Sequence, residues 1–313
     1  MILSVSRRTD IPAFYCDWFF NRLKEGYVSV RNPMYYHHVS NVKLSPEVID
    51  CIVFWTKNPS IIVDRLHLLQ DYLYYFHVTI NGYDNNIERF LPPKDIVIAN
   101  FIRLSEKIGK KRVIWRYDPI ILNNDLTIDY HIEKFHRIAS QLENHTEKCV
   151  ISFVDPYEKT IRNTTGFRIA EIAQSQMKVI GKHIADAAQD HGIKVETCSE
   201  GIDLSEYEIQ HTSCIDKALI SVLSGYSIIV KDDKQRDGCC CSTCIDIGAY
   251  NTCKHGCTYC YATFSDSTVK NNCEKYNPNS SLIVGEIGID DKVTDRKMVS
   301  YKSGQISFDS IIQ

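Results

Sequence analysis

The chain lacks the segments that would carry it to or across a membrane. It has no run of about eighteen consecutive apolar residues, so we expect no membrane-spanning helix. Its start also lacks the order of basic, then apolar, then small residues that marks a signal peptide. We therefore expect a soluble, cytoplasmic protein that does not bind a membrane.

A large excess of charge of either sign is also missing. The 36 Lys and Arg against 39 Asp and Glu give a formal net charge of −3 at pH 7. This balance argues against a generally basic surface for nucleic acid, although a local basic groove remains compatible with it. With 44% hydrophobic residues among 313, the chain can bury a sizeable core in one large domain or two ordinary ones.

Strand-like and helix-like segments alternate through the first 235 residues, which is typical of a parallel α/β sheet or barrel. Apolar residues at helical spacing predict amphipathic helices, for example over residues 132–142 and 169–188. A strand and a helix recur about every 40 residues, the rhythm of a TIM-like (β/α) barrel or partial barrel. We expect strands at residues 2–5, 27–30, 51–55, 72–80, 112–117, 149–154 and 193–197.

Charged or amide-bearing residues follow the expected strands. In a barrel these strand ends gather at one mouth, where catalytic residues lie. Each such residue taken singly could instead cap a helix or face solvent. The catalytic candidates at this mouth are Arg7, Arg8, Lys57, Arg116, Asp118 and Glu200. Arg31 and Asn58 are candidates for binding a cofactor, and the cations as a set would suit an anionic or phosphorylated substrate.

Thirteen cysteines are many for a cytosolic chain, in which clustered cysteines more often bind metal than form disulfides. Cys253, Cys257 and Cys260 follow C-x3-C-x2-C spacing, and Gly256 lets the backbone turn tightly between them. Three thiolates aimed at one point suit a cubic iron–sulfur cluster with one open iron. Closed structural zinc sites instead use four protein ligands. We therefore predict that these three cysteines bind an iron–sulfur cluster.

This loop resembles the cluster motif of the radical S-adenosylmethionine enzymes, in which an aromatic residue, here Tyr259, commonly precedes the third cysteine. Residues 259–261 are most similar to the spore photoproduct lyase branch. The resemblance implies a [4Fe-4S] cluster whose open iron chelates S-adenosylmethionine, and an electron that cleaves this molecule to methionine and a 5′-deoxyadenosyl radical. It makes Tyr259 a cofactor-binding candidate. It also implies a small-molecule or nucleotide substrate and an electron donor such as a flavodoxin or ferredoxin, and the lyase branch leaves a nucleic-acid substrate open.

Stretches along nearly the whole chain resemble an uncharacterised bacterial family, domain-of-unknown-function family 1848. They lie at residues 6–12, 53–59, 113–119, 214–217 and 246–253. That family is described as carrying a C-terminal cysteine cluster like the one near the N-terminus of radical S-adenosylmethionine proteins. In those enzymes the motif follows the first barrel strand, whereas here it comes after seven expected strands. A circularly permuted barrel would restore the geometry, but a Gly-Gly-Glu-like segment is not evident.

Cys198, Cys214, Cys239 and Cys241 lie outside the three-cysteine loop. Four thiolates from distant segments would suit a second, fully ligated iron–sulfur cluster or a structural zinc site. Alternatively, Cys198 and Cys214 are core or cap residues. We expect a barrel-like domain at 1–235, a Cys-rich iron–sulfur segment at 236–275 and a small tail at 276–313.

Three interpretations of the whole protein follow from these patterns. The leading one is an enzyme of the radical S-adenosylmethionine type that acts on an unknown substrate. The second is an iron–sulfur electron carrier or redox sensor without S-adenosylmethionine chemistry. The third is a barrel whose cysteines hold structural zinc.

Overall fold

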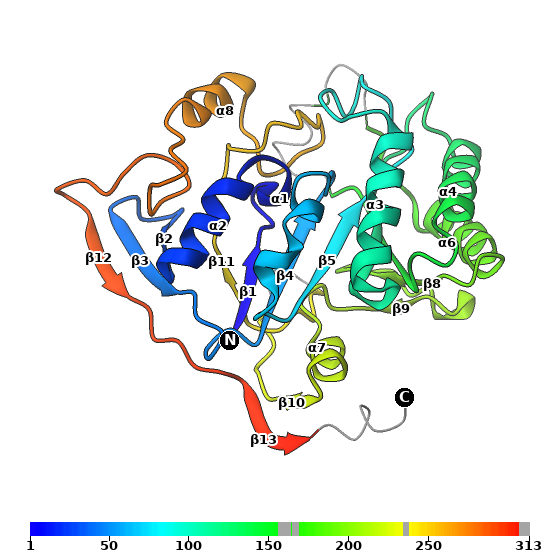
Figure 1. Cartoon of the computed structure of the whole chain (residues 1–313). Coiled ribbons are helices and arrows are strands. Elements are labelled where there is room, and N and C mark those ends of the chain that lie inside the picture. Colours follow the sequence, from blue (N-terminus) through cyan, green and yellow to red (C-terminus); the bar gives the residue numbers. More distant parts are fainter. Residues whose placement is uncertain (156–163, 165–168, 234–237, 307–313) are drawn as a thin grey trace.

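The computed structural model describes residues 1–155, 164, 169–233 and 238–306. Its main element is an eight-stranded sheet in the order β11-β1-β4-β5-β6-β7-β8-β9, and all neighbouring strands are parallel (Figure 1). These strands are β1 (Ile2–Val5), β4 (Cys51–Thr56), β5 (Tyr74–Thr79), β6 (Val113–Ile120), β7 (Lys148–Phe153), β8 (Lys194–Thr197), β9 (Gln210–His211) and β11 (Ile245–Asp246). The predicted α/β fold with a parallel sheet is therefore confirmed.

The sheet has two edges. Its end strands are β11 and β9, and no pairing joins them within the described part of the chain. A closed barrel has no edge strands, because its last strand pairs with its first. The sheet therefore does not close into a complete barrel. The parallel strands and covering helices of the expected barrel are present, but its closure is not.

The strands are buried because both faces of the sheet are covered, as parallel sheets require. Successive side chains point to opposite faces. In β4, Ile52 and Phe54 belong to the larger hydrophobic core, while Cys51 and Val53 belong to a second core on the other face. This alternation explains why the strand reads as one continuous apolar run.

Helices cover the first face. The larger core takes residues from α1 (Ile11–Phe14), α2 (Cys16–Glu25), α3 (Lys94–Ile108), α4 (Ile128–Leu142) and α6 (Gln174–Gln189). Helix α4 contains the helix expected over residues 132–142, whereas the helix expected over 169–188 begins only at Gln174, as α6. Against the second face packs α7 (Lys217–Ser224), through Ile220 (Figure 1). No helix in the described ranges is long and apolar enough to cross a bilayer. Short 3₁₀ turns occupy η1 (Ile62–Asp64), η2 (Leu66–Leu69), η3 (Lys110–Arg112) and η4 (Ser205–Tyr207).

One expected barrel strand belongs to a different sheet. The strand expected at 27–30 forms as β2 (Tyr27–Arg31), but it pairs antiparallel with β3 (His38–Lys43). The short connection over residues 32–37 allows this hairpin, whereas parallel neighbours need a long crossover. Strand β12 (Lys292–Asp295) completes this small sheet beside β3. The expectation that Arg31 lies at the mouth of the large sheet is therefore wrong.

The C-terminal region is joined to earlier parts of the chain. Helix α8 (Asp266–Cys273) follows the three-cysteine loop. Strand β13 (Lys302–Ile306) pairs antiparallel with β10 (Tyr226–Ile228), so both late strands extend earlier elements. Residues 307–313 of the expected tail lie outside the described residues.

Candidate functional site

The three-cysteine loop follows β11, and residues 247–252 connect the end of that strand to Cys253. The carboxylate of Asp246 in β11 accepts hydrogen bonds from Ser4 Oγ at 2.6 Å and from Ser6 Oγ at 2.7 Å. It also accepts the backbone N–H groups of Arg7 at 2.8 Å and Gly248 at 3.0 Å. One buried carboxylate thus joins the end of β1 to the start of the loop.

The segment 87–90 holds the loop from its other side. Glu88 forms an isolated antiparallel bridge with Cys257, and the backbone N–H of Phe90 donates to the His255 carbonyl at 3.0 Å. Gly256 has φ +65°, and a Cβ there would lie 2.6 Å from Phe90 Cδ2. Only glycine fits this position, since it has no Cβ and tolerates positive φ.

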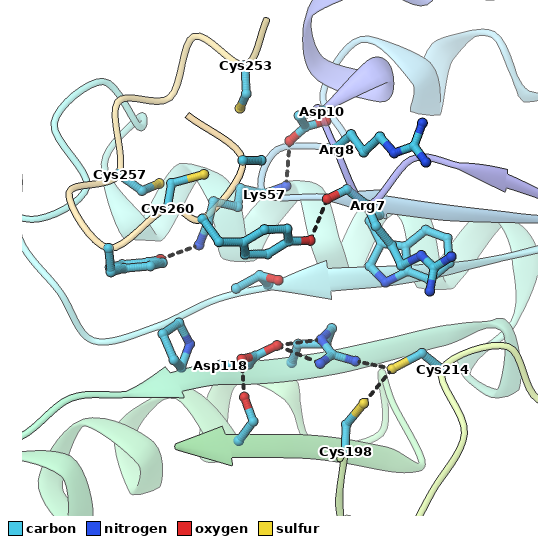
Figure 2. Close-up of a pocket in the computed structure, with 18 of the residues that line it drawn as sticks. Arg7, Arg8, Asp10, Lys57, Asp118, Cys198, Cys214, Cys253, Cys257 and Cys260 are labelled. Carbon is cyan, nitrogen blue, oxygen red and sulfur yellow. Dashed lines mark hydrogen bonds and ion pairs between the residues drawn. The ribbon is translucent and has the colours of Figure 1, made fainter. Parts of the chain in front are cut away.

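A cavity of about 820 Å³ lies beside the loop, within the size range of ligand pockets. Its walls come from the loop itself, from the carboxyl-end residues of β4, β5, β6 and β7, and from the segments that follow β1, β4, β7 and β8 (Figure 2). Most of the residues predicted for the site line it: Arg7, Arg8, Lys57, Arg116, Asp118, Tyr259, Cys253, Cys257, Cys260, Cys198, Cys214, Cys239 and Cys241.

Three predicted residues are not among those that line the cavity. Arg31 makes two hydrogen bonds to the Asp291 carboxylate, at 2.6 and 2.7 Å, beside the small sheet. Asn58 accepts a hydrogen bond from the Ser60 backbone through its side chain, which stabilises the turn after β4. Glu200 accepts the backbone N–H of Phe153 at 2.9 Å. These contacts give the three residues structural roles at strand ends.

Every predicted cation of the cavity has a carboxylate partner. Lys57 Nζ lies 2.7 Å from Glu88, and Arg116 lies 2.5 Å from Asp118. Arg7 and Arg8 share Asp246 at 3.8 and 3.9 Å. The cations that line the cavity are matched in number by its carboxylates Asp10, Asp118, Asp155 and Asp246. This balance gives no support to the expected preference for an anionic substrate.

Glu88 is the centre of a buried polar network behind the loop. Its carboxylate accepts Lys57 Nζ at 2.7 Å and the Tyr259 hydroxyl at 2.5 Å, and it pairs with Lys94. Burial opposes ionisation of Glu88, but the two lysines outweigh it and hold its pKa at about 2. Lys57 Nζ also donates to the Tyr259 hydroxyl at 2.8 Å. The network therefore fixes the aromatic ring that precedes Cys260.

The three loop cysteines act on one another electrostatically. Burial raises the pKa of Cys253 well above its usual value, and the neighbouring Cys260, Asp10 and Cys257 raise it further. Burial likewise raises the pKa of Cys257 to about 12, with Lys57 opposing this shift. Metal binding requires deprotonated ligands, so a metal centre held by these cysteines would have to offset the cost of ionising them. Cysteine sulfur is nevertheless the donor type that iron–sulfur clusters use.

A single metal ion would need several ligand side chains that point at one position. Within the part of the chain that the structure describes, no three His, Cys, Asp or Glu side chains converge on one ion position. A cubic cluster binds each thiolate through a different iron, so its ligands stand further apart than the ligands of one zinc ion.

Several site residues were not predicted. Asp10 accepts a 2.7 Å hydrogen bond from His255, which lies inside the loop, and Asp246 and Glu88 hold the loop from two sides. Asp10 precedes Pro12 and reads as an ordinary helix cap. Glu88 has no local pattern at all, since its partners lie far away in the sequence. Asp10 and Asp246 lie within the stretches 6–12 and 246–253 that resemble the family, but that resemblance gave them no role, and no sequence signal marks Glu88.

Comparison with known proteins assigns the chain to one family. The family described as "Domain of unknown function (DUF1848)" matches residues 2–262. No curated protein matches the chain. A crystal structure of a putative alpha-L-fucosidase from Bacteroides thetaiotaomicron VPI-5482 is similar at 12% identity and a TM-score of 0.27. The similarity covers 51% of this chain and 66% of that one, slightly less than two thirds of its length.

Proposed function

Because the chain belongs to the DUF1848 family, whose function is unknown, we propose from its own site that it is a radical S-adenosylmethionine-type enzyme. In this proposal Cys253, Cys257 and Cys260 hold a [4Fe-4S] cluster with one open iron. When bound and reduced, that cluster supplies the electron that cleaves S-adenosylmethionine to methionine and a 5′-deoxyadenosyl radical. The cavity beside the loop binds the substrate from which this radical takes a hydrogen atom.

One observation carries the proposal. The three-cysteine loop follows β11, and β11 pairs in parallel with β1 at the edge of the sheet. Strand β11 is the last strand of this sheet along the chain, and it lies beside β1, the first strand. A circularly permuted fold, in which the cysteine motif comes next to the first strand in space, requires this arrangement. The loop thereby opens at the carboxyl ends of the parallel strands, where α/β folds bind their ligands.

The protein's own residues supply position and a closed environment. The Glu88 network and the His255–Asp10 hydrogen bond hold the loop from both ends of the cysteine run. Asp118 lies across the cavity from the loop cysteines (Figure 2), and it forms an ion pair with Arg116, which also lines the cavity. Since the charges of the lining balance, we expect a polar substrate of low net charge, with an electron donor such as a flavodoxin or ferredoxin.

The cavity favours an enzyme over an electron carrier. A carrier needs its cluster near the surface but has no use for an adjoining space of about 820 Å³. All three cysteines line this space, so a cluster held by them would face it. Cofactor enzymes use such a space to orient substrate and to exclude water.

Anaerobic reconstitution tests the proposal. Reduced protein loaded with iron and sulfide is incubated with S-adenosylmethionine, and 5′-deoxyadenosine is measured. We expect wild-type protein to form it and Cys257→Ala to lose it. Cys240→Ala is the matched control, because Cys240 is exposed and does not line the cavity. Wild-type protein with a fully loaded cluster that forms no 5′-deoxyadenosine would overturn the enzyme assignment and favour the electron carrier.

A further inference from the structure

We propose that Cys198 and Cys214 form a redox-active thiol pair, which exchanges two electrons with a small disulfide bound in the cavity. Figure 2 shows the two side chains facing each other on a part of the wall away from the three-cysteine loop. Their Sγ atoms lie 2.9 Å apart, and both residues line the cavity. The inference goes beyond the proposed function and does not depend on a cluster in the loop.

The distance between the two sulfur atoms suits a disulfide better than a metal site. Two thiolates on one zinc ion stand roughly 3.8 Å apart, and a cubic cluster holds its thiolates further apart still. A disulfide needs its sulfurs at about 2.05 Å, so the sulfurs of Cys198 and Cys214 must come only about 0.9 Å closer. Their contact therefore does not suit the second metal site that the sequence suggests for these cysteines.

The backbone brings the two cysteines side by side. Cys198 directly follows β8, and Cys214 lies three residues beyond the end of β9. These strands are parallel neighbours, and their pairing continues where the Thr212 N–H donates to the Thr197 carbonyl at 2.8 Å. The Cys214 carbonyl accepts a hydrogen bond from the Tyr75 hydroxyl at 2.7 Å. Hydrogen bonds thus fix the backbone on both sides of the sulfur contact.

Packing alone accounts for other cysteines. Cys51 and Cys149 lie singly inside β4 and β7 and are wholly buried, as small apolar residues are. Cys198 and Cys214 also belong to the second core, but they lie outside the regular elements and line the cavity. A molecule in the cavity therefore lies against this pair.

Arg116 favours Cys214 as the thiol that reacts first. Its Nη1 donates to Cys214 Sγ at 2.9 Å, while its Nε and Nη2 bind the Asp118 carboxylate. A guanidinium beside a thiol stabilises the thiolate, which is the nucleophile of disulfide exchange. The hydrogen bond with Cys198 also lowers the pKa of Cys214, but the Cys241 thiol and burial raise it, to about 11. A small thiolate fraction of Cys214 therefore reacts at neutral pH.

The exchange balances in two steps. Cys214 loses its proton and its sulfur attacks the small disulfide, so that a mixed disulfide forms and one small thiolate leaves and takes up that proton. Cys198 then loses its proton and its sulfur attacks the Cys214 sulfur. The Cys198–Cys214 bond forms, and the second small thiolate leaves and takes up the second proton. Two protein thiols are thereby oxidised by two electrons, and one small disulfide is reduced to two thiols.

Peptide mapping of the wild-type chain tests the inference. Reduced protein is incubated anaerobically with hydroxyethyl disulfide, a small uncharged probe, and is then quenched with acid, alkylated and digested. We expect a peptide that links Cys198 to Cys214 in most chains, and excess dithiothreitol should restore both thiols. C240A should form the same link, because Cys240 is exposed and does not line the cavity.

Serine variants show which sulfur attacks first. In C198S the second step is blocked, so Cys214 should retain the mixed disulfide with mercaptoethanol. In C214S the first step is blocked, so Cys198 should remain a thiol. A mixed disulfide on Cys198 in C214S, with none on Cys214 in C198S, would overturn the assigned order of attack.

The wild-type measurement needs no substitution, so it decides the inference even if a variant fails to fold. Far-UV circular dichroism identifies any such variant. If Cys198 and Cys214 both remain open to alkylation in folded wild-type protein, the redox-active pair is overturned. A link from Cys214 to Cys241 in place of Cys198 overturns it as well.

Discussion

The imidazole of His255 lies 2.7 Å from the carboxylate of Asp10, and both side chains are buried. His255 lies between the first two cysteines of the loop, and Asp10 precedes the first helix. The same Asp10 oxygen, Oδ2, also accepts the backbone N–H of Lys57 at 2.7 Å. A single carboxylate thus ties the cysteine loop to the turns that follow β1 and β4.

Replacing Asp10 with alanine should lower the free energy of unfolding by about 2–4 kcal/mol. The change removes the cap on the Ala13 N–H, an effect of about 1 kcal/mol, and leaves His255 and Lys57 N–H without their buried acceptor. Urea unfolding of the protein measures the loss. Asp64→Ala removes an exposed ion pair and should cost less than about 1 kcal/mol. Equal losses for the two variants would contradict the role of Asp10.

Two glycines differ sharply in the space around them, which gives a matched pair of substitutions. A Cβ on Gly248 would lie 2.0 Å from Ser6 Oγ, whereas a Cβ on Gly201 would meet nothing within 4 Å. Gly248→Ala should therefore destabilise the protein by about 1–3 kcal/mol, and Gly201→Ala should be nearly neutral. Thermal unfolding of both variants checks this. An unchanged midpoint for Gly248→Ala would show that β1 and β11 are not held this closely.

Stability at acid pH should depend on Glu88. Its pKa is held at about 2 by Lys57 and Lys94, below its value in the unfolded chain, so ionised Glu88 stabilises the fold above the unfolded pKa near 4.5. That contribution should fall away as the pH drops from about 4.5 toward 2. Glu88→Gln should cost about 3–5 kcal/mol at pH 7, because two buried or half-buried lysines lose their partner.

Urea unfolding at pH 7 and at pH 3 measures both effects of Glu88. The difference between wild-type protein and Glu88→Gln should be smaller at pH 3 than at pH 7. Glu133→Gln is the control, because Glu133 is exposed on α4 and pairs only with its neighbour Lys134. A constant difference between wild type and Glu88→Gln across this range would contradict the depressed pKa.

Asp246→Ala should weaken the cysteine loop more than any single change within it. Four donors lose their acceptor, and two of these are the hydroxyls of Ser4 and Ser6 in and beside β1. We expect a loss of about 2–5 kcal/mol and a reduced iron content after reconstitution. Asp203→Ala removes one exposed hydrogen bond to the Ser205 N–H, so it should cost less than about 1 kcal/mol and leave the iron content unchanged. Full iron loading of Asp246→Ala would show that β11 does not position the loop.

Local patterns were sufficient for the parts of the fold that are local. The apolar run at residues 2–5 matches β1 in both bounds, because its side chains are buried on both faces. The same reasoning failed for residues 27–30. They do form a strand, but a six-residue connection returns the chain to an antiparallel neighbour outside the large sheet. Arg31 therefore lies at the end of β2 in the small sheet and not at the expected site.

Very short elements escaped prediction for a physical reason. Strand β11 has two residues, Ile245 and Asp246, and only its pairing with β1 makes it a strand. No periodicity can arise in two residues. Yet this strand places the cysteine loop at the edge of the sheet beside β1. The sequence could suggest a circular permutation, but only the structure shows which strand pairs with β1.

By itself the sequence determined the α/β class, the longer strands and the three-thiol spacing within one loop, because each depends on side chains close together in the chain. Tertiary structure alone decided that four distant cysteines share the cavity wall, that the cavity's cations are paired with carboxylates, and that Asp10, Glu88 and Asp246 hold the loop. Those relationships join residues far apart in sequence. They exist only once burial of the sheet has brought their segments together.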